Sequence, residues 1–171
     1  FSEEDEQLLY SATDDYFGNF LFAGIHTGLR PFCELARVTA DDVIESERGM
    51  QWRVYASKTG KTRTIPVRSE VAELTRQLMD EVGADPTTSL FRNSRGGAWT
   101  KVAGVQRFRS SYTCRHTFAH RMLAGYWNDG QGCSIEVLAE LMGDTPKVAF
   151  DHYGREWGQH YQEPLWTAIG M

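Results

Sequence analysis

The sequence predicts an α+β fold that is mainly helical and carries one small antiparallel sheet. Apolar residues recur at helical spacing through most of the chain, whereas residues 50–67 alternate between apolar and polar. The 171 residues are 41% hydrophobic, which is enough to bury one sizeable core. We therefore expect a single domain over residues 1–171.

Two helices are predicted within residues 3–28, the second more apolar than the first and ending near Gly28. Pro31 predicts a short new helix, because proline fits the first helical turn. The residue before a proline is pushed towards extended geometry. Arg30 is therefore expected at a corner between two helices, where the backbone holds its side chain in place.

A β-hairpin is predicted from residues 50–57 and 62–67, joined by a turn that contains Lys58. Val43 and Ile44 are candidates for a third strand. Three further helices follow from amphipathic stripes over residues 69–82, 115–127 and 134–142. The chain has no internal repeat and no convincing linker.

Composition excludes several classes of protein. No apolar run approaches the roughly 18 residues of a membrane span, and the acidic N-terminus lacks the features of a signal peptide. We therefore expect a cytoplasmic protein. The three cysteines have no paired spacing, which argues against a disulfide framework and a zinc ribbon. They are expected to be reduced and mostly buried.

The net charge of -5 hides a strongly basic segment. Residues 92–121 contain seven Lys or Arg and no Asp or Glu, so the rest of the chain carries -12. Aromatic residues are interspersed, as on a surface that follows phosphates. The alternative is a solvated face with a chance excess of charge. The basic residues are Arg92, Arg95, Lys101, Arg107, Arg109, Arg115 and Arg121.

Four motifs occur in order along the chain. Together they resemble the catalytic domain of the tyrosine recombinases, the family of phage integrases and Xer-type resolvases, over essentially the whole sequence. The resemblance implies the mainly helical fold of that domain, with Lys58 on its hairpin. The motifs are Thr27-Gly28-Leu29-Arg30 with Glu34, Ser57-Lys58-Thr59-Gly60, Tyr112-Thr113-Cys114-Arg115-His116-Thr117-Phe118, and Leu141-Met142-Gly143-Asp144 followed by Tyr153.

The resemblance implies a site-specific DNA recombinase that cleaves and rejoins strands through a 3′-phosphotyrosyl intermediate, with neither metal nor ATP. Arg30 and Arg115 would clamp the scissile phosphate, since a planar guanidinium binds two oxygens and keeps its proton. Preorganised cations of this kind stabilise the charge that builds up during phosphoryl transfer.

The remaining catalytic assignments also follow from the resemblance. Tyr153 would be the nucleophile, with Tyr112, Tyr126 and Tyr161 as weaker candidates. Lys58 would protonate the departing 5′ oxygen as a general acid, although Lys61 is a close competitor. Lys61 and the basic segment are further predicted DNA contacts.

The sequence departs from the family pattern at two positions. Tyr112 stands where the family usually has a histidine, and Asp144 stands where it usually has a histidine or tryptophan. These departures put the proton transfers in doubt, and the two residues are kept as candidate catalytic groups. Glu34 and His116 are assigned supporting roles. A metal site formed by His26, Asp144 and His152 lacks tight ligand spacing and is disfavoured.

The resemblance also bears on partners and on the extent of the chain. It implies double-stranded DNA as substrate, and a monomer that forms a tetramer on paired sites, with residues 154–171 as one route of assembly. It implies a bacterial or phage-derived protein of a mobile element. Members of the family also have an N-terminal core-binding domain, which we expect to be absent from this chain. Between Trp99 and Tyr112 the sequence is short for the family, so we expect missing residues there, the alternative being a short loop.

Two other functions stay open from the sequence. One is a DNA-binding module that has lost catalysis, which the residues at positions 112 and 144 suggest. The other is an enzyme resembling type IB topoisomerases, which nicks DNA without choosing a site. The target sequence is not encoded in these motifs, because phosphate contacts carry no base information.

Overall fold

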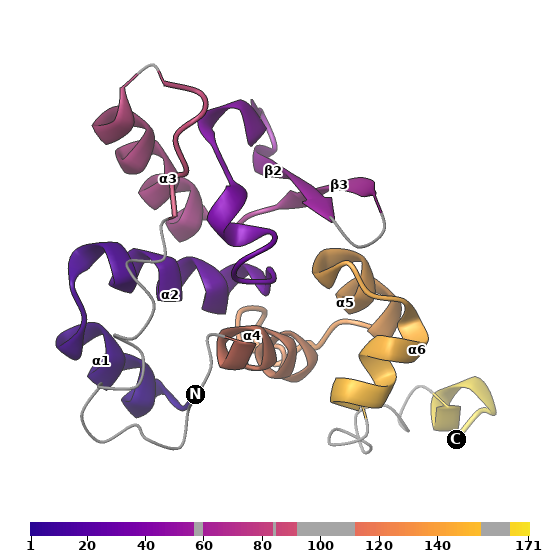
Figure 1. Cartoon of the computed structure of the whole chain (residues 1–171). Coiled ribbons are helices and arrows are strands. Elements are labelled where there is room, and N and C mark those ends of the chain that lie inside the picture. The colour runs from indigo at the N-terminus through magenta and orange to yellow at the C-terminus, as the bar shows by residue number, and fades with distance from the viewer. Residues whose placement is uncertain (57–59, 84, 92–111, 155–164) are drawn as a thin grey trace. The chain divides into compact units, whose positions relative to one another are not determined.

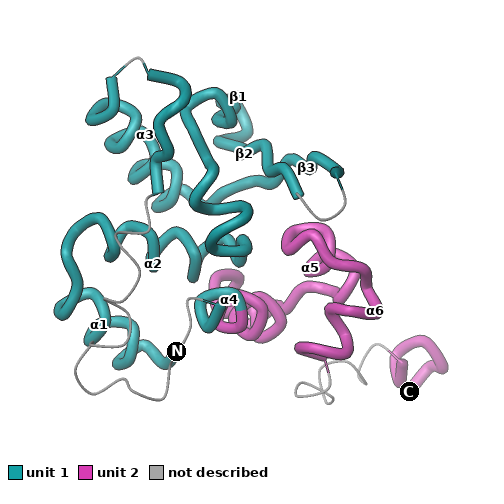
Figure 2. The backbone as a smooth tube through the Cα atoms, viewed as in Figure 1, with its two compact units in different colours: residues 1–115 teal, residues 116–171 magenta. Residues whose placement is uncertain are grey.

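The computed structural model describes residues 1–56, 60–83, 85–91, 112–154 and 165–171 (Figure 1). The chain divides into two compact units, residues 1–115 and residues 116–171, which Figure 2 shows in different colours. The helix α4 (Tyr112–Ala124) begins in the first unit and continues into the second. The expectation of a single domain stays a prediction.

The first unit opens with the two predicted helices, α1 (Glu3–Ala12) and α2 (Asp15–Thr27). Side chains cap both N-termini: Ser2 and Asp5 form a reciprocal capping box, and Asp14 accepts from the backbone N–H of Phe17. α2 ends at Gly28, whose φ of 68° is left-handed and suits glycine. The structure therefore confirms the prediction of two helices within residues 3–28.

The prediction of a helix that begins at Pro31 is wrong. A turn follows Arg30, and the next helical residues form only a short 3-10 helix, η1 (Leu35–Arg37). The Glu34 side chain accepts from the Arg30 backbone N–H, a local bond that competes with regular helix formation. In keeping with this, Glu34 has non-helical torsions, and the Leu35 N–H reaches back five residues to the Arg30 carbonyl.

A second 3-10 helix, η2 (Ala40–Asp42), leads into a three-stranded antiparallel sheet in the order β1-β2-β3. The sheet confirms both the hairpin and the third strand. Paired residues share a face, so Arg63, opposite Val54, lies on the buried face of the sheet, and Arg53 lies on the other. The strands are β1 (Val43–Ser46), β2 (Gly49–Ala56) and β3 (Lys61–Pro66).

The helix α3 (Ser69–Val82) has the predicted bounds and packs against both α2 and β2. Trp52 and Phe91 are fully buried beside each other, with ring centroids 5.1 Å apart. Burial of two large aromatic side chains contributes much of the free energy that stabilises the core of this unit. The core thereby supports the sheet and the corner after α2.

Between residues 116 and 154, the second unit contains the rest of α4 and three short elements. α4 begins and ends three residues earlier than predicted. It ends there because Gly125 adopts a φ of 70° and stops the helix. Ser134 caps the predicted helix α5 through the Val137 N–H. The other elements are α5 (Ile135–Met142), α6 (Pro146–Ala149) and a π-helical turn, η4 (Phe150–Gly154).

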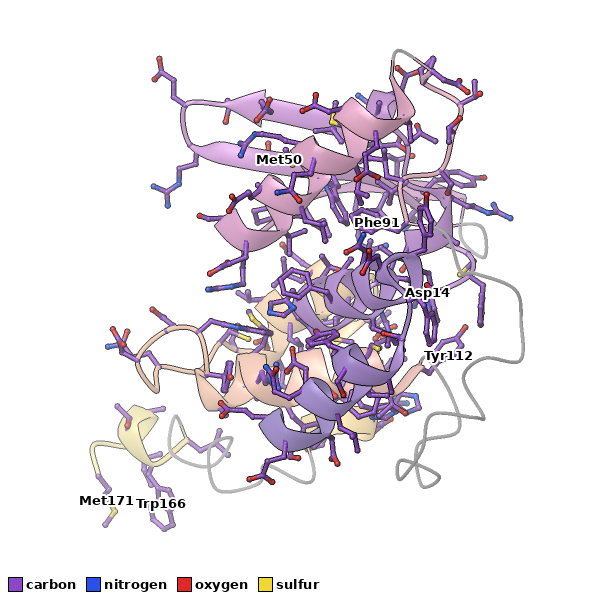
Figure 3. The ribbon with its side chains drawn as sticks, turned by 90° about the vertical axis from the view of Figure 1, so that its left-hand side faces the viewer. Asp14, Met50, Phe91, Tyr112, Trp166 and Met171 are labelled. Carbon is purple, nitrogen blue, oxygen red and sulfur yellow. The ribbon has the colours of Figure 1, made fainter. Side chains whose placement is uncertain are left out.

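Side chains from α4, α5, α6 and η4 form the core of this unit. The described C-terminal residues, 165–171, include a short helix over 165–168 with exposed apolar side chains, of which Figure 3 labels Trp166 and Met171. Within the described ranges, every helix is too short or too polar to span a lipid bilayer. The core residues are Phe118, Ala119, Leu123, Ile135, Leu138, Ala139, Met142, Ala149 and Tyr153.

Candidate active site

Arg30 lies at the predicted corner after α2, and a buried carboxylate holds it there. The Glu34 side chain is fully buried, whereas that of Arg30 is 19% exposed. Glu34 Oε1 accepts from the Arg30 backbone N–H at 2.8 Å, and Oε2 accepts from Arg30 Nη1 at 3.2 Å. The carboxylate therefore fixes both the backbone and the guanidinium of Arg30. Its supporting role in catalysis stays a prediction.

Arg63 on β3 is a second partner of Glu34 that the sequence did not predict. Its Nη1 donates to Oε2 at 2.6 Å, and its Nη2 donates to Oε1 at 3.2 Å. This two-pronged geometry is the strongest form of an arginine–carboxylate pair. The sequence gives only a weak signal for this contact. The alternation of residues along β3 predicts that the side chain of Arg63 points inward, but it does not identify a partner.

The ion pairs change the titration of Glu34. Burial by itself would raise the pKa of this carboxyl, but hydrogen bonds from the Arg63 side chain and the Arg30 backbone, with the charges of both arginines, hold its pKa below the usual value. Glu34 is therefore ionised near neutral pH. The site keeps a fixed anion between two cations.

Arg115 lies in the first turns of α4 and contacts the same corner of the first unit. Its side chain reaches the end of α2, where Nη1 donates to the Gly28 carbonyl at 2.7 Å. Arg115 is only 5% exposed. Because Gly28 is two residues before Arg30, Arg115 stabilises the backbone that carries the other predicted clamp.

Cys114 explains how α4 comes so close to α2. A Cβ on Gly24 would lie 3.1 Å from the Cys114 Cβ, so the two helices pack closely through glycine and a small thiol. Burial raises the pKa of Cys114 to about 12, which keeps the thiol neutral. Cys33 and Cys133 are partly buried, and all three cysteines are free, as predicted.

Tyr153 and His116 are in contact within the second unit. Their ring centroids are 5.2 Å apart with an interplanar angle of 73°, an edge-to-face arrangement. Tyr153 is 5% exposed and belongs to the apolar core, whereas His116 is exposed. Tyr153 lies near the end of η4.

Tight packing around Gly154 holds Tyr153 in this position. A Cβ on Gly154 would lie 2.5 Å from Phe150 Cδ2, closer than side chains allow, and 3.3 Å from Ile135 Cδ1, a tight contact. The backbone after the tyrosine can therefore lie directly on α5. Asp144, after the C-cap Gly143 of α5, is half-buried, and Tyr112 is exposed at the first turn of α4 (Figure 3).

Several predicted residues fall outside the described ranges. Lys58 and most of the basic segment are among them, as are Tyr161 and the short stretch before Tyr112. Lys61 is described and is exposed at the start of β3. The other undescribed members of the predicted site are Arg92, Arg95, Lys101, Arg107 and Arg109.

Arg121 has a packing role that the sequence did not predict. It is 8% exposed, and its guanidinium carbon lies 4.5 Å from the ring centroid of Tyr126 and 5.9 Å from that of Trp127. Cation–π contacts of this kind stabilise a helix end. A phosphate contact by Arg121 stays a prediction.

The described residues form no metal cluster, and a cavity in the first unit lies apart from the predicted site residues. Among them, no group of three or more His, Cys, Asp or Glu side chains is arranged to hold a metal ion. A cavity of about 420 Å³ lies in the first unit, lined by Tyr10, Asp14, Phe22 and Glu70 among others. None of the predicted site residues lines it.

Comparison with known sequences identifies relatives of one kind. The chain is 30% identical to a tyrosine recombinase XerD of Chlorobaculum tepidum over 59% of its length, and 30% identical to a XerD of Corynebacterium glutamicum over 70% of its length. It spans only 36% and 41% of these two relatives. No family model matches the sequence.

Solved structures of recombinases and integrases have a fold similar to that of this chain. The catalytic domain of bacteriophage HP1 integrase superposes with a TM-score of 0.63 at 22% identity, covering 88% of this chain and 84% of that one. The XerA recombinase gives a TM-score of 0.66 at 21% identity, covering 88% and 58%. XerH bound to its difH substrate gives 0.65 at 13% identity, covering 97% and 52%.

Proposed function

Because this chain is a homologue of the tyrosine recombinases and has the fold of their catalytic domain, we propose that it cleaves and rejoins DNA strands at specific sites. Tyr153 is the proposed nucleophile, and Arg30 and Arg115 are the proposed phosphate clamps. The corner at Gly28–Arg30 carries the proposal, since Glu34 orients Arg30 there and Arg115 bonds Gly28.

The proposed chemistry is a reversible transesterification. Tyr153 Oη attacks the scissile phosphorus, so that the bond between Oη and phosphorus forms and the bond to the 5′ oxygen breaks. The phenol releases its proton to the solvent, and the departing 5′ oxygen gains one, with Lys58 as the proposed donor. The 3′-phosphotyrosyl bond keeps the energy of the phosphodiester, so the reverse attack by a 5′ hydroxyl rejoins the strand.

The two arginines have distinct tasks in this scheme. A phosphodiester repels nucleophiles, and further charge builds up on its oxygens in the transition state. Arg30 is partly exposed and oriented by Glu34, which suits direct binding of a phosphate oxygen. Arg115 is more buried and supports the backbone at Gly28, so it orients the corner as well as adding charge.

One observation supports the alternative of a DNA-binding module without turnover. Tyr153 is 5% exposed and packs among apolar residues, so its phenol must leave this environment before it can attack DNA. Tyr112 and Asp144 also replace the usual proton-transfer groups. A module of this kind would bind DNA with salt-sensitive affinity and form no covalent link.

A suicide DNA substrate tests the function. It carries a nick close to the cleavage site, so that a short fragment diffuses away after cleavage and the covalent complex accumulates. We expect the wild-type chain to form a complex stable to denaturing electrophoresis in the presence of a metal chelator. Tyr153→Phe should abolish this complex, because the phenyl ring fills the same space but lacks the attacking oxygen.

Tyr55→Phe is the matched control, because Tyr55 is exposed on the sheet and lies outside the proposed site. It should trap DNA as well as the wild type does. A complex that persists in Tyr153→Phe would contradict the assignment of the nucleophile. DNA binding by the wild type with no complex on any substrate would favour the binding module, and relaxation of arbitrary supercoiled plasmids would favour the topoisomerase-like enzyme.

We also propose that the chain acts as an assembly on DNA. Similar structures include a lambda integrase tetramer bound to a Holliday junction, with a TM-score of 0.57. In this chain the short helix over residues 165–168 and its neighbours carry exposed apolar side chains suited to docking on a partner copy. A monomer in solution and a tetramer on paired sites would be distinguished by sedimentation with and without DNA.

A further inference from the structure

Glu34 is shared between two arginines that are distant in sequence. Arg30 precedes it by four residues, and Arg63 follows it by 29. The two-pronged contact comes from Arg63, at 2.6 and 3.2 Å, while Arg30 Nη1 meets Oε2 at 3.2 Å. Arg63 is therefore placed to be the main charge partner of the buried carboxylate.

This division of contacts determines the net charge of the cluster formed by Arg30, Glu34 and Arg63. Together the two guanidinium groups and the carboxylate carry one positive charge in excess. If Glu34 had Arg30 alone, the pair would be neutral, and a carboxylate within about 4 Å would also repel an incoming phosphate. With Arg63 bound across both oxygens, the same carboxylate can orient Arg30 and still leave the cluster attractive to an anion.

Arg63 also joins two parts of the first unit. It lies on β3, on the buried face beside Val54, and its contact with Glu34 ties that strand to the corner after α2. Lys61 is two residues earlier and therefore on the same face of the strand. The strand β3, which begins three residues after Lys58 in the sequence, is thus tied to the Arg30 corner.

We propose that Arg63 is a positioning residue of the phosphate clamp: by binding both oxygens of Glu34, it keeps Arg30 oriented and gives the cluster of Arg30, Glu34 and Arg63 a net positive charge. The inference rests on the proposed function, because it assigns to Arg63 a part in the same site. Arg63 acts through Glu34 and Arg30, so its loss should slow cleavage more than it weakens DNA binding.

Three variants test the inference. Arg63→Gln removes the charge and the two-pronged contact, and Arg63→Lys keeps the charge but cannot span both oxygens. Arg53→Gln is the control, because Arg53 carries the same charge on the opposite face of the same sheet. The rate of covalent-complex formation at saturating suicide substrate and the Kd for the same DNA are measured for each, after thermal denaturation has shown that it folds.

A misplaced clamp is expected to lower the cleavage rate of Arg63→Gln on the order of a hundredfold, while the Kd stays within about threefold of that of Arg53→Gln. Arg63→Lys should recover part of the rate. Equal cleavage rates in Arg63→Gln and Arg53→Gln would overturn the inference, as would a loss confined to the Kd, which would make Arg63 a DNA contact. If Arg63→Gln does not fold, a wild-type cleavage rate in Arg63→Lys would overturn it.

A readout that needs no catalysis separates this inference from the proposed function. The ¹⁵N-edited NMR signal of the Arg30 Nε–H, identified by its loss in Arg30→Lys, reports the environment of that guanidinium in the DNA-free protein. We expect it to shift in Arg63→Gln and to stay unchanged in Arg53→Gln. An unmoved signal in Arg63→Gln would contradict the inference that Arg63 orients Arg30 through Glu34. A wild-type chain that never traps DNA would contradict the proposed function, and the NMR result would still test whether Arg63 orients Arg30.

Discussion

At the scale of single residues, Glu34 shows how a carboxylate can serve a cationic site. Its side chain is fully buried, and its oxygens accept from Arg30 and Arg63. Burying an unpaired carboxylate would be very costly, so the carboxylate requires both arginines, and they in turn are oriented by it. Glu34 is therefore expected to support both stability and activity.

Glu34→Gln should destabilise the protein by about 2 kcal/mol. Losing one partner of a fully buried ion pair usually costs more. The cost is smaller here because the side chains of Arg30 and Arg63 are 19% and 17% exposed. Chemical denaturation at neutral pH measures the change. Glu45→Gln is the matched control, since Glu45 also loses an arginine partner, Arg76, but the pair is exposed. Equal stabilities of the two variants would contradict the structural role of Glu34.

The pH dependence of this difference has a definite sign. Because the pKa of folded Glu34 lies below its ordinary value of 4.5, the ionised form contributes stability that is fully present above pH 4.5. That contribution is lost as the pH falls through the lower, folded-state pKa. The stability difference between the wild type and Glu34→Gln should therefore shrink below pH 4.5, which denaturation at a series of acidic pH values measures. A difference that grows on acidification would contradict the depressed pKa.

The sequence motifs were enough to predict Arg30, Glu34 and Arg115 as members of one site, because each stands beside recognisable neighbours. Arg63 could not be predicted in this way. Alternation along β3 predicts which face an arginine occupies, but its partner is 29 residues away and depends on how the sheet packs on the corner. The contact between His116 and Tyr153 likewise depends on tertiary packing of two segments 37 residues apart in the sequence.

At the scale of elements, the close packing of α2 on the start of α4 brings Arg115 to the Gly28 carbonyl. Gly24 permits this approach, because a side chain there would meet Cys114. A glycine inside a helix otherwise costs about 1 kcal/mol relative to alanine. The sequence showed the glycine in α2 but not the neighbour that makes it necessary.

Gly24→Ala and Gly18→Ala form a matched pair within α2. Both gain the same helix propensity, but a Cβ at Gly24 lies 3.1 Å from the Cys114 Cβ, whereas a Cβ at Gly18 lies 3.4 Å from its nearest neighbour, Thr13 Oγ1. We expect Gly24→Ala to be less stable than Gly18→Ala by about 1–2 kcal/mol, the usual cost of overpacking. Thermal denaturation compares them, and equal melting temperatures would show that the contact is not tight.

Most of the elements could be predicted from hydrophobic periodicity, because their apolar stripes are regular and their ends carry glycine or capping residues. The exceptions have local causes. The segment after Pro31 fails to form a regular helix because Glu34 bonds the Arg30 backbone. The π-helical turn at Tyr153 could not be predicted, because its geometry depends on the packing of Gly154 against Phe150 and Ile135.

At the scale of the whole molecule, charge is distributed unevenly. The chain carries -5 overall, although seven basic residues lie between positions 92 and 121. We expect binding to DNA to depend on that segment and therefore on salt, since each neutralised phosphate releases counterions. If about five phosphates are contacted, the Kd should rise about 500-fold between 50 and 200 mM monovalent salt.

Fluorescence anisotropy with labelled duplex DNA measures this dependence. Replacing Arg92 and Arg95 by Gln should weaken binding and flatten the salt dependence, whereas Arg48→Gln, in the exposed turn between β1 and β2, should change neither. The same salt slope in all of these variants would mean that the basic segment does not contact DNA. A Kd independent of salt would exclude phosphate binding as the main source of affinity.

The central claim is that Tyr153 becomes covalently attached to DNA, and peptide mapping of the trapped complex tests it most directly. Trypsin cleavage after Lys147 and Arg155 releases residues 148–155, a peptide in which Tyr153 is the only tyrosine. After nuclease digestion, mass spectrometry should find the remaining nucleotide on this peptide. A nucleotide on residues 110–115, which contain Tyr112, or on any other peptide would contradict the claim.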